Sequence, residues 1–178
     1  MADAVFSACF LNEMNRNCDI VGMANFAPIV NTRGCIFTYP GGIVLRSTYY
    51  VFDLYVNYLG DVVLDTWNEN IPELKVKHKN GHDVTVDAVD VICTKWSDRP
   101  GIALAAVNKE AEKEQTITLD ISECKGTVKM YTVSGTSTES YNDVDHEEVF
   151  MEEFDLGDYE CGMQITLRPH SVNVIQIV

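Results

Sequence analysis

A chain of 178 residues can form one ordinary domain, or one domain with an appendage, and either can bury a hydrophobic core. Its 27 Asp and Glu residues against 13 Lys and Arg give a net charge of −14, which repels the phosphate backbone of nucleic acids. It has no apolar run long enough to cross a membrane, and its first residues lack the basic start and small-residue cleavage site of a signal peptide. We therefore expect neither a nucleic-acid nor a membrane partner.

The charge is unevenly distributed along the chain. Residues 1–60 hold four acids and three bases, a net charge of −1, whereas residues 61–178 hold 23 acids and ten bases, a net charge of −13. This step predicts that two parts of different structure meet near Gly60.

Residues 4–16 have the spacing of an amphipathic helix, with Asp3 available as its N-cap. The apolar residues on its predicted inner face are Val5, Phe6, Cys9, Phe10 and Met14. The run from Ile20 to Ala27 is apolar except at Asn25, which is typical of a parallel strand covered on both faces. A helix followed by a buried strand indicates α/β structure.

Turn sequences at residues 31–34 and 40–42 frame two short extended segments, CIFTY and IVLR. A second helix is predicted for residues 48–59, capped by Ser47 and closed by Gly60 in the left-handed conformation. Its predicted inner face consists of Tyr49, Phe52, Val56 and Leu59. Aromatic residues at helical spacing favour core packing, and the alternative is a platform on which sugars stack. These aromatic residues are Tyr49, Tyr50, Phe52, Tyr55 and Tyr58.

From Val62 onward the sequence consists of short alternating segments, and nothing in it has a helical period. Asn80-Gly81 is a hairpin signal, and residues 98–101 and 125–126 are turns. Eight or nine strands at a spacing of roughly ten residues predict an antiparallel β-sandwich or jelly roll. The expected fold class is mainly β, with a C-terminal antiparallel sandwich preceded by α/β elements.

The six cysteines include no CxxC pair and have no regular spacing, which argues against a metal site or a disulfide scaffold. They are Cys9, Cys18, Cys35, Cys93, Cys124 and Cys161. We predict free thiols, which are typical of a reducing compartment, and therefore a cytoplasmic protein.

Four segments resemble the terminal third of the family 51 α-L-arabinofuranosidases and occur in that family's order. They are VGMANFAPIVNTRG (residues 21–34), GGIVLRSTYYVFDLYVNYLGD (41–61), IALAAVNK (102–109) and LRPHSVNVIQI (167–177). The resemblance covers nearly the whole chain and is weakest between Lys109 and Cys161. It implies that residues 1–60 are the terminal helix, strand and helix of a (β/α)8 catalytic barrel. Residues 61–178 would be the C-terminal, jelly-roll-like β-sandwich domain.

The resemblance also implies a parent that is a retaining, exo-acting α-L-arabinofuranosidase. Such an enzyme releases arabinofuranosyl groups from arabinan, arabinoxylan or derived oligosaccharides. Retaining glycosidases use two carboxyl groups about 5–5.5 Å apart. The family places these two Glu residues at the ends of the fourth and seventh barrel strands, which the resemblance puts upstream of Met1. We therefore expect no catalytic residue in this chain, no activity of its own and no cofactor.

Barrel active sites form at the C-terminal ends of strands, so Asn25, Phe26 and Pro28 are the candidates for contact with substrate. Many family members carry a sugar-binding Gln soon after this segment, whereas here Pro28 follows Ala27. That contact is therefore not carried over to any residue. For Asn25 the alternative is a buried amide that satisfies backbone groups.

Three further groups of polar residues favour structural roles. His78 and His82 flank a predicted hairpin tip, so we expect no zinc site and no other metal. Residues 139–160 hold ten acids and no Lys or Arg, and the stretch NDVDHEE lacks the glycine and spacing of a calcium loop, which favours a solvated acidic hairpin. His170 and Ser171 are adjacent on a strand and point to opposite faces, unlike a nucleophile and its base.

Two other functional classes remain open. An independent carbohydrate-binding β-sandwich module would need a groove or exposed aromatic residues, for which Trp67 and Trp96 are the candidates. A purely structural domain would mediate assembly, and the resemblance implies a homo-oligomer. We expect its contacts in residues 1–60, because barrel elements without a barrel leave apolar side chains and a strand edge uncovered.

Overall fold

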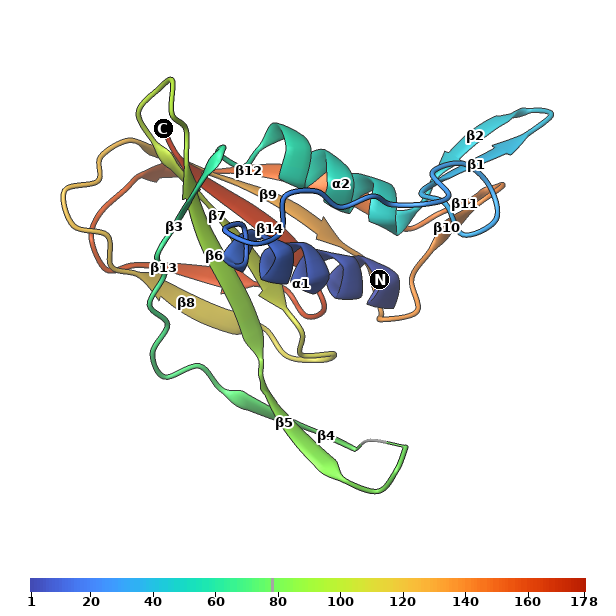
Figure 1. Ribbon diagram of the computed structural model, residues 1–178, viewed down its shortest axis with the longest axis horizontal. Helices are drawn as coiled ribbons and strands as arrows, with labels where there is room; N and C mark the ends of the chain where they lie inside the picture. The colour runs from blue at the N-terminus through green and yellow to red at the C-terminus, as the bar shows by residue number, and fades with distance from the viewer. Residues whose placement is uncertain (78) are drawn as a thin grey trace.

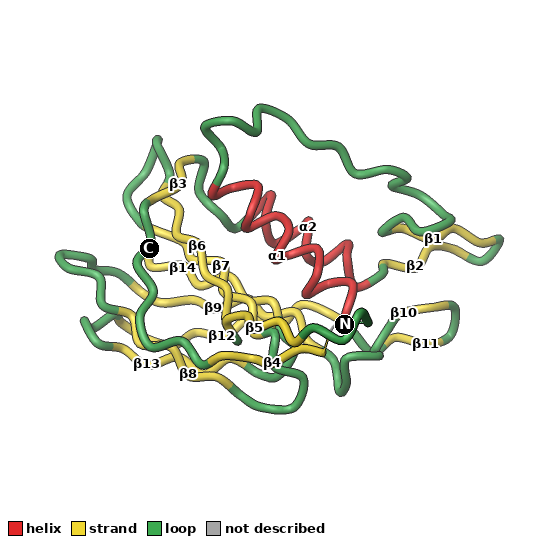
Figure 2. The backbone as a smooth tube through the Cα atoms, turned by 60° about the horizontal axis from the view of Figure 1, so that its bottom comes forward, coloured by secondary structure: helices red, strands yellow, loops and turns green. Residues whose placement is uncertain are grey.

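The computed structural model describes residues 1–77 and 79–178, and within them the chain forms three layers. Helices α1 (Ala2–Arg16) and α2 (Ser47–Asn57) lie on one face of a six-stranded sheet, and a two-stranded sheet lies on the other (Figures 1 and 2). The prediction of a mainly β fold with an antiparallel sandwich is confirmed.

The central sheet has the strand order β12-β9-β14-β7-β6-β3, and all neighbouring strands in it are antiparallel. Its strands are β3 (Val62–Leu64), β6 (Val89–Lys95), β7 (Ile102–Asn108), β9 (Thr127–Ser134), β12 (Phe150–Asp158) and β14 (Val172–Ile177). The middle strands β7 and β14 are buried almost throughout because both faces of the sheet are covered there. The buried Asn173 is satisfied within the sheet, since its amide donates to the Ala106 carbonyl (3.0 Å) and accepts from the Thr132 hydroxyl (2.9 Å).

The second sheet consists of β8 (Gln115–Leu119) and β13 (Met163–Leu167). Its side chains alternate between solvent and the sandwich core, and those facing the core include Leu119, Ile165 and Leu167. They pack against residues of the central sheet such as Leu104 and Ile175. This contact forms the hydrophobic core of the sandwich.

Three hairpins extend from these layers. They are β1–β2 (Ile36–Tyr39 and Gly42–Leu45), β4–β5 (Glu73–Lys77 and Asp83–Asp87) and β10–β11 (Asn142–Asp143 and His146–Glu147). The first confirms the predicted extended segments, and the second confirms the hairpin signal at Asn80-Gly81, with Gly81 at a φ of +80°. The β4–β5 hairpin projects as an arm from the bottom of the molecule in Figure 1.

The helices approach the central sheet through small and branched side chains. Ala4 and Ala8 of α1 and Val51 and Leu54 of α2 are fully buried in one hydrophobic cluster with β7, β9 and β14. The end of α1 is fixed by an ion pair between Arg16 and Asp90 of β6. The helices thus form their own core on the face of the sheet opposite β8 and β13.

The predicted inner faces of the helices are confirmed only in part, since Val5, Cys9 and Leu59 pack in the helix–sheet cluster and three other residues do not. Phe6 and Phe10 of α1 are 70% and 54% exposed, and Val56 of α2 is 75% exposed. The inner faces instead carry the smaller residues, because small side chains allow a helix to lie close to the sheet. The helices therefore have a second apolar face that points away from the sheet.

The aromatic residues of the second helix segment are all partly buried. The Tyr55 hydroxyl donates to the Asn12 side-chain oxygen (2.5 Å) or to the Ala8 carbonyl (3.1 Å), and the Tyr58 ring packs on Tyr131 with centroids 4.2 Å apart. These contacts join α2 to α1 and to β9, as core packing predicts.

The predicted strand at residues 20–27 is also wrong. Turns and irregular backbone follow α1, and Ile20 to Ala27 are all exposed. A parallel strand needs hydrogen-bonding neighbours, and the described residues provide none for this segment. Asn25 is accordingly not the buried amide of the alternative interpretation.

The three predicted helix-end residues have different roles from those expected, and the N-cap of α2 is Arg46 rather than Ser47. Met1 is the N-cap of α1, and Asp3 lies in the first turn, where its charge favours the helix dipole. Helix α2 ends at Asn57, and Gly60 is not left-handed. A Cβ atom at Gly60 would lie 2.2 Å from the Lys95 carbonyl oxygen, so glycine is required there by close backbone approach.

Neither of the two described helices is long and apolar enough to span a membrane.

Candidate functional site

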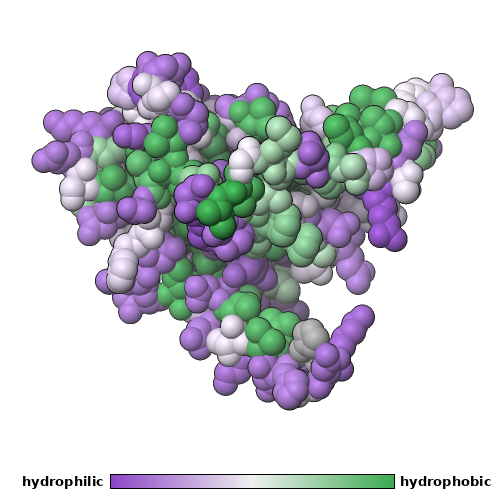
Figure 3. Space-filling model, in the orientation of Figure 1, coloured by the Kyte–Doolittle hydropathy of each residue, from purple (hydrophilic) through white to green (hydrophobic). Residues whose placement is uncertain are grey.

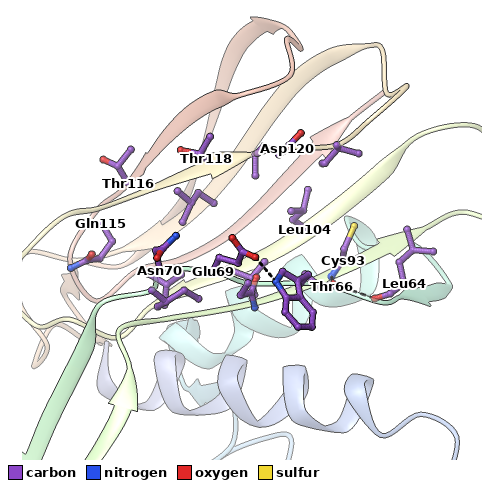
Figure 4. Close-up of a pocket in the computed structure, with 18 of the residues that line it drawn as sticks. Leu64, Thr66, Glu69, Asn70, Cys93, Leu104, Gln115, Thr116, Thr118 and Asp120 are labelled. Atoms are coloured by element: carbon purple, nitrogen blue, oxygen red, sulfur yellow. Dashed lines mark hydrogen bonds between the residues drawn. The ribbon is translucent and has the colours of Figure 1, made fainter.

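A groove of about 860 Å³ lies between the segment that follows β3 and strand β8 (Figure 4). The segment of residues 64–72 forms one wall, and residues 115–122 form the other. Strands β6 and β7 supply the floor with Val89, Val91 and Leu104. The groove exists because the second sheet has only two strands and leaves part of the six-stranded sheet uncovered.

The rim of the groove carries polar groups at positions set by local hydrogen bonds. The Trp67 indole N–H donates to the Glu69 carboxylate (2.9 Å), and the Thr66 hydroxyl donates to the Leu64 carbonyl (3.1 Å). Thr66 also accepts from the Cys93 backbone N–H (3.1 Å), which holds the segment against β6. On the opposite wall Figure 4 shows Thr116 and Thr118 of β8, which point away from Trp67, and Asp120 just after the strand.

The lining offers an open aromatic ring and polar groups beside an unactivated thiol. Burial raises the pKa of the Cys93 thiol to about 11, so the thiol stays protonated near neutral pH and is a poor nucleophile. Among the described residues there is no group of three or more His, Cys, Asp or Glu side chains that would hold a metal ion. The exposed Trp67, at 86%, and the polar rim offer stacking and hydrogen bonds to a sugar, whereas the floor offers only apolar contact.

The predicted substrate-adjacent residues lie elsewhere. Asn25, Phe26 and Pro28 belong to the exposed segment beside α2, where the Phe26 ring packs on Phe52 with centroids 4.8 Å apart. None of the three lines the groove. Their contact with substrate stays a prediction that depends on the rest of the parent protein.

The other sequence candidates have structural contacts. The two ring nitrogens of His170 lie 2.8 Å from the Ala111 carbonyl and 3.0 Å from the Gly135 carbonyl, while the Ser171 hydroxyl donates to the Arg168 carbonyl (2.7 Å). Both side chains therefore hold loops in place and do not form a nucleophile–base pair.

Trp96 is half-buried under the Arg99 guanidinium, 4.2 Å from its ring centroid, and so lacks the open face of Trp67. The predicted acidic hairpin is confirmed as β10–β11, with most of its acids exposed. Of the two histidines at the β4–β5 turn, His82 is exposed and His78 lies outside the described residues.

The sequence indicated Trp67 but not the groove. The clue was the polar stretch of residues 65–70, DTWNEN, which interrupts the strand pattern between two apolar segments. The groove itself depends on how far apart β8 and β6 lie, which is a nonlocal property.

Comparison with known proteins identifies the family to which the chain belongs. The sequence pattern of the alpha-L-arabinofuranosidase C-terminal domain matches residues 1–171. The chain belongs to this family. The match begins at residue 1, so the family domain includes the two helices as well as the sandwich.

Individual relatives agree with the family match. The chain is 27% identical to the probable alpha-L-arabinofuranosidase C of Aspergillus niger over 99% of its own length and 34% of that protein. The α-L-arabinofuranosidase of Thermotoga maritima superposes with a TM-score of 0.84 at 24% identity, over 98% of this chain and 38% of that one. The family 51 enzyme of Thermotoga petrophila gives 0.85 at 23% identity, over 99% and 38%.

The chain thus spans about a third of the length of its curated relative and corresponds to the C-terminal part of these arabinofuranosidases. The resemblance inferred from the four sequence segments is confirmed.

Proposed function

We propose that this chain is the non-catalytic C-terminal part of a retaining, exo-acting α-L-arabinofuranosidase. The parent would release arabinofuranosyl groups from arabinan- or arabinoxylan-type glycans. The family match over residues 1–171 supports this proposal. This C-terminal part would stabilise the catalytic barrel and carry no catalytic group or cofactor.

The observation that supports this role most directly is the second apolar face of the helix layer. Phe6, Phe10 and Val56 point away from the central sheet, and the exposed segment of residues 20–30 adds Met23 and Ile29. Figure 3 shows hydrophobic surface over this part of the molecule. Residues 1–60 would therefore be the terminal barrel elements, with one face on the sandwich and the other on the rest of the barrel.

Two assays test the proposal. The chain alone should show no turnover of an aryl α-L-arabinofuranoside, whereas the parent should. In the parent, Phe6→Asp combined with Phe10→Asp should reduce thermal stability and activity, because both charges would be buried against the barrel. The same two substitutions should leave the isolated chain folded. Val76→Asp, at an exposed apolar position on the β4–β5 arm, is the matched control, and an equal loss in that variant would contradict the proposal.

The groove favours a second candidate function, a carbohydrate-binding module, because it combines an open indole with polar rim groups. Titration calorimetry of the chain with arabino-oligosaccharides tests it. Heat of binding that disappears in Trp67→Ala and persists in Trp96→Ala would support this function. No heat with either protein would leave the chain as a purely structural domain.

We also propose a cytoplasmic location and a homo-oligomeric parent. The location is supported by the six cysteines, all of which are free thiols in the structure. The assembly is supported by the outer apolar face, which a second copy could cover where the barrel does not.

A further inference from the structure

The acidic hairpin β10–β11 is held in place by one buried amide. The Asn142 side chain donates to the Leu45 carbonyl (2.9 Å) and to the Val149 carbonyl (2.6 Å). Its oxygen accepts from the backbone N–H groups of Glu148 (2.9 Å) and Val149 (2.8 Å). The bond to Leu45 joins this hairpin to strand β2, and Figures 1 and 2 both show the β1–β2 and β10–β11 hairpins side by side. The amide therefore fixes the acidic hairpin against the segment of residues 1–60.

The opposite side of the hairpin carries aromatic and polar side chains. Residues paired across an antiparallel hairpin point to the same side, and Asp143 pairs with His146. Side chains alternate along each strand, so Tyr141 and Glu148 lie on this side, away from Asn142. The Tyr141 ring packs on the His146 ring with centroids 4.6 Å apart, and His146 Nε2 lies 3.5 Å from a Glu148 carboxylate oxygen. The hairpin face is defined as Tyr141, Asp143, His146 and Glu148.

Hydrogen bonds hold the carboxylates of the hairpin face in position. The Thr136 hydroxyl donates to the second oxygen of Glu148 (2.8 Å), and the Val144 backbone N–H donates to one oxygen of Asp143 (2.8 Å). The bond from Thr136 lowers the pKa of the Glu148 carboxyl, so this group is ionised near neutral pH. Side chains that are already ordered lose less conformational entropy when a ligand binds.

The chemistry of the hairpin face suits a neutral sugar. Tyr141 is 56% exposed, so its ring is open to stack on the C–H groups of a sugar. Carboxylates accept hydrogen bonds from hydroxyl groups, and a neutral imidazole both donates and accepts. Residues 139–160 contain ten acids and no Lys or Arg, so the hairpin repels phosphate and uronic acid groups. A basic peptide would be attracted by charge, but it would not need the open ring.

We propose that the hairpin face binds a neutral oligosaccharide. The class of ligand rests on the proposed function, because the bond from Asn142 to Leu45 attaches this face to the segment that would belong to a glycosidase barrel. The Tyr141 ring stacks on a sugar unit, while Asp143 and Glu148 accept hydrogen bonds from its hydroxyl groups. None of these residues lines the groove beside Trp67, so the hairpin face is a separate site.

NMR titration of the ¹⁵N-labelled chain with arabinotriose tests the proposal. Saturable shift changes should appear at residues 141–148. Tyr141→Ala should weaken this binding about tenfold or more, whereas Tyr141→Phe keeps the ring and should stay within about threefold of the wild type. Both variants should keep the wild-type spectrum away from the hairpin. The matched control is Trp67→Ala, which removes an exposed ring at the groove and should leave binding at residues 141–148 unchanged.

Salt and a charged probe distinguish a sugar from a basic peptide. Binding of the neutral trisaccharide should be the same between about 50 and 500 mM NaCl, because screening acts only on charges. The proposal would be overturned by an absence of saturable shifts at the hairpin face, by an equal loss in Trp67→Ala, or by shifts with trilysine and none with arabinotriose. Turnover of an aryl arabinofuranoside by the parent tests the proposed function separately, so the two failures are distinguishable.

Discussion

The exposure of Phe6, which the sequence pattern placed on the inner face of α1, can be tested by two substitutions with reversed expectations. If the large residues faced the core, Phe6→Ala would cost about 3–5 kcal/mol of unfolding free energy, and Ala8→Leu would be nearly neutral. The structure reverses both expectations, because Phe6 is 70% exposed and Ala8 is fully buried.

The magnitudes follow from the exposed fractions. Full burial of a Phe side chain contributes about 1.5–3 kcal/mol, so the buried 30% of Phe6 contributes about 0.5–0.9 kcal/mol. The higher helix propensity of alanine offsets about 0.5 kcal/mol of this, and the net loss in Phe6→Ala is about 0.5 kcal/mol or less. Ala8→Leu adds three carbon atoms to a filled site, at a cost of about 1–3 kcal/mol.

Urea denaturation of the isolated chain at low micromolar concentration measures both values. A cost of 1 kcal/mol corresponds to a fall in melting temperature of about 2–4 °C for a chain of this size. The control is Ala2→Leu, the same chemical change at an exposed position of the same helix, and it should be within about 0.5 kcal/mol of wild type. A loss above about 2 kcal/mol in Phe6→Ala, with Ala8→Leu as harmless as the control, would refute the observed packing.

Three further predictions concern buried and titrating groups. Tyr55→Phe leaves the fully buried Asn12 amide without its partner and should cost about 1–3 kcal/mol in denaturation, much of which the double variant with Asn12→Leu should restore. Cys93 should react with iodoacetamide at pH 8 more slowly than an exposed thiol, as mass spectrometry of the native protein would show, because burial raises its pKa to about 11. Hydrogen bonds from Ser97 lower the pKa of Asp61, so Ser97→Ala should raise that pKa in an NMR titration. The lowered folded-state value means that this interaction favours the native state above pH 3.8 and is lost as pH falls through the folded pKa, and an unchanged pKa in the variant would contradict it.

The sandwich could be predicted from the sequence because its signals are local. Alternation of apolar and polar residues located the main strands, and Asn80-Gly81 located the turn of the arm. The candidate groove could not be predicted, since it depends on the distance between β8 and the segment after β3. The local sequence pattern indicated only that Trp67 lies in a polar stretch.

The prediction of a strand at residues 20–27 was wrong because such a strand also depends on nonlocal contacts. Its apolar composition is suited to a parallel sheet, but such a strand forms only when neighbours supply hydrogen bonds on both edges. The described residues supply none, and the segment is irregular and exposed. The apolar composition of residues 20–27 suits a strand with neighbours on both edges. This chain by itself does not provide those neighbours.

The same reasoning explains why Phe6 and Phe10 were predicted on the inner face of α1. A sequence pattern ranks positions by hydrophobicity, so the large aromatic residues outweigh the alanines beside them. In the structure Ala4 and Ala8 are buried, whereas Phe6 and Phe10 are exposed. The small residues allow the helix to lie close to the sheet, and the helix layer therefore keeps large apolar side chains on the side away from the sandwich.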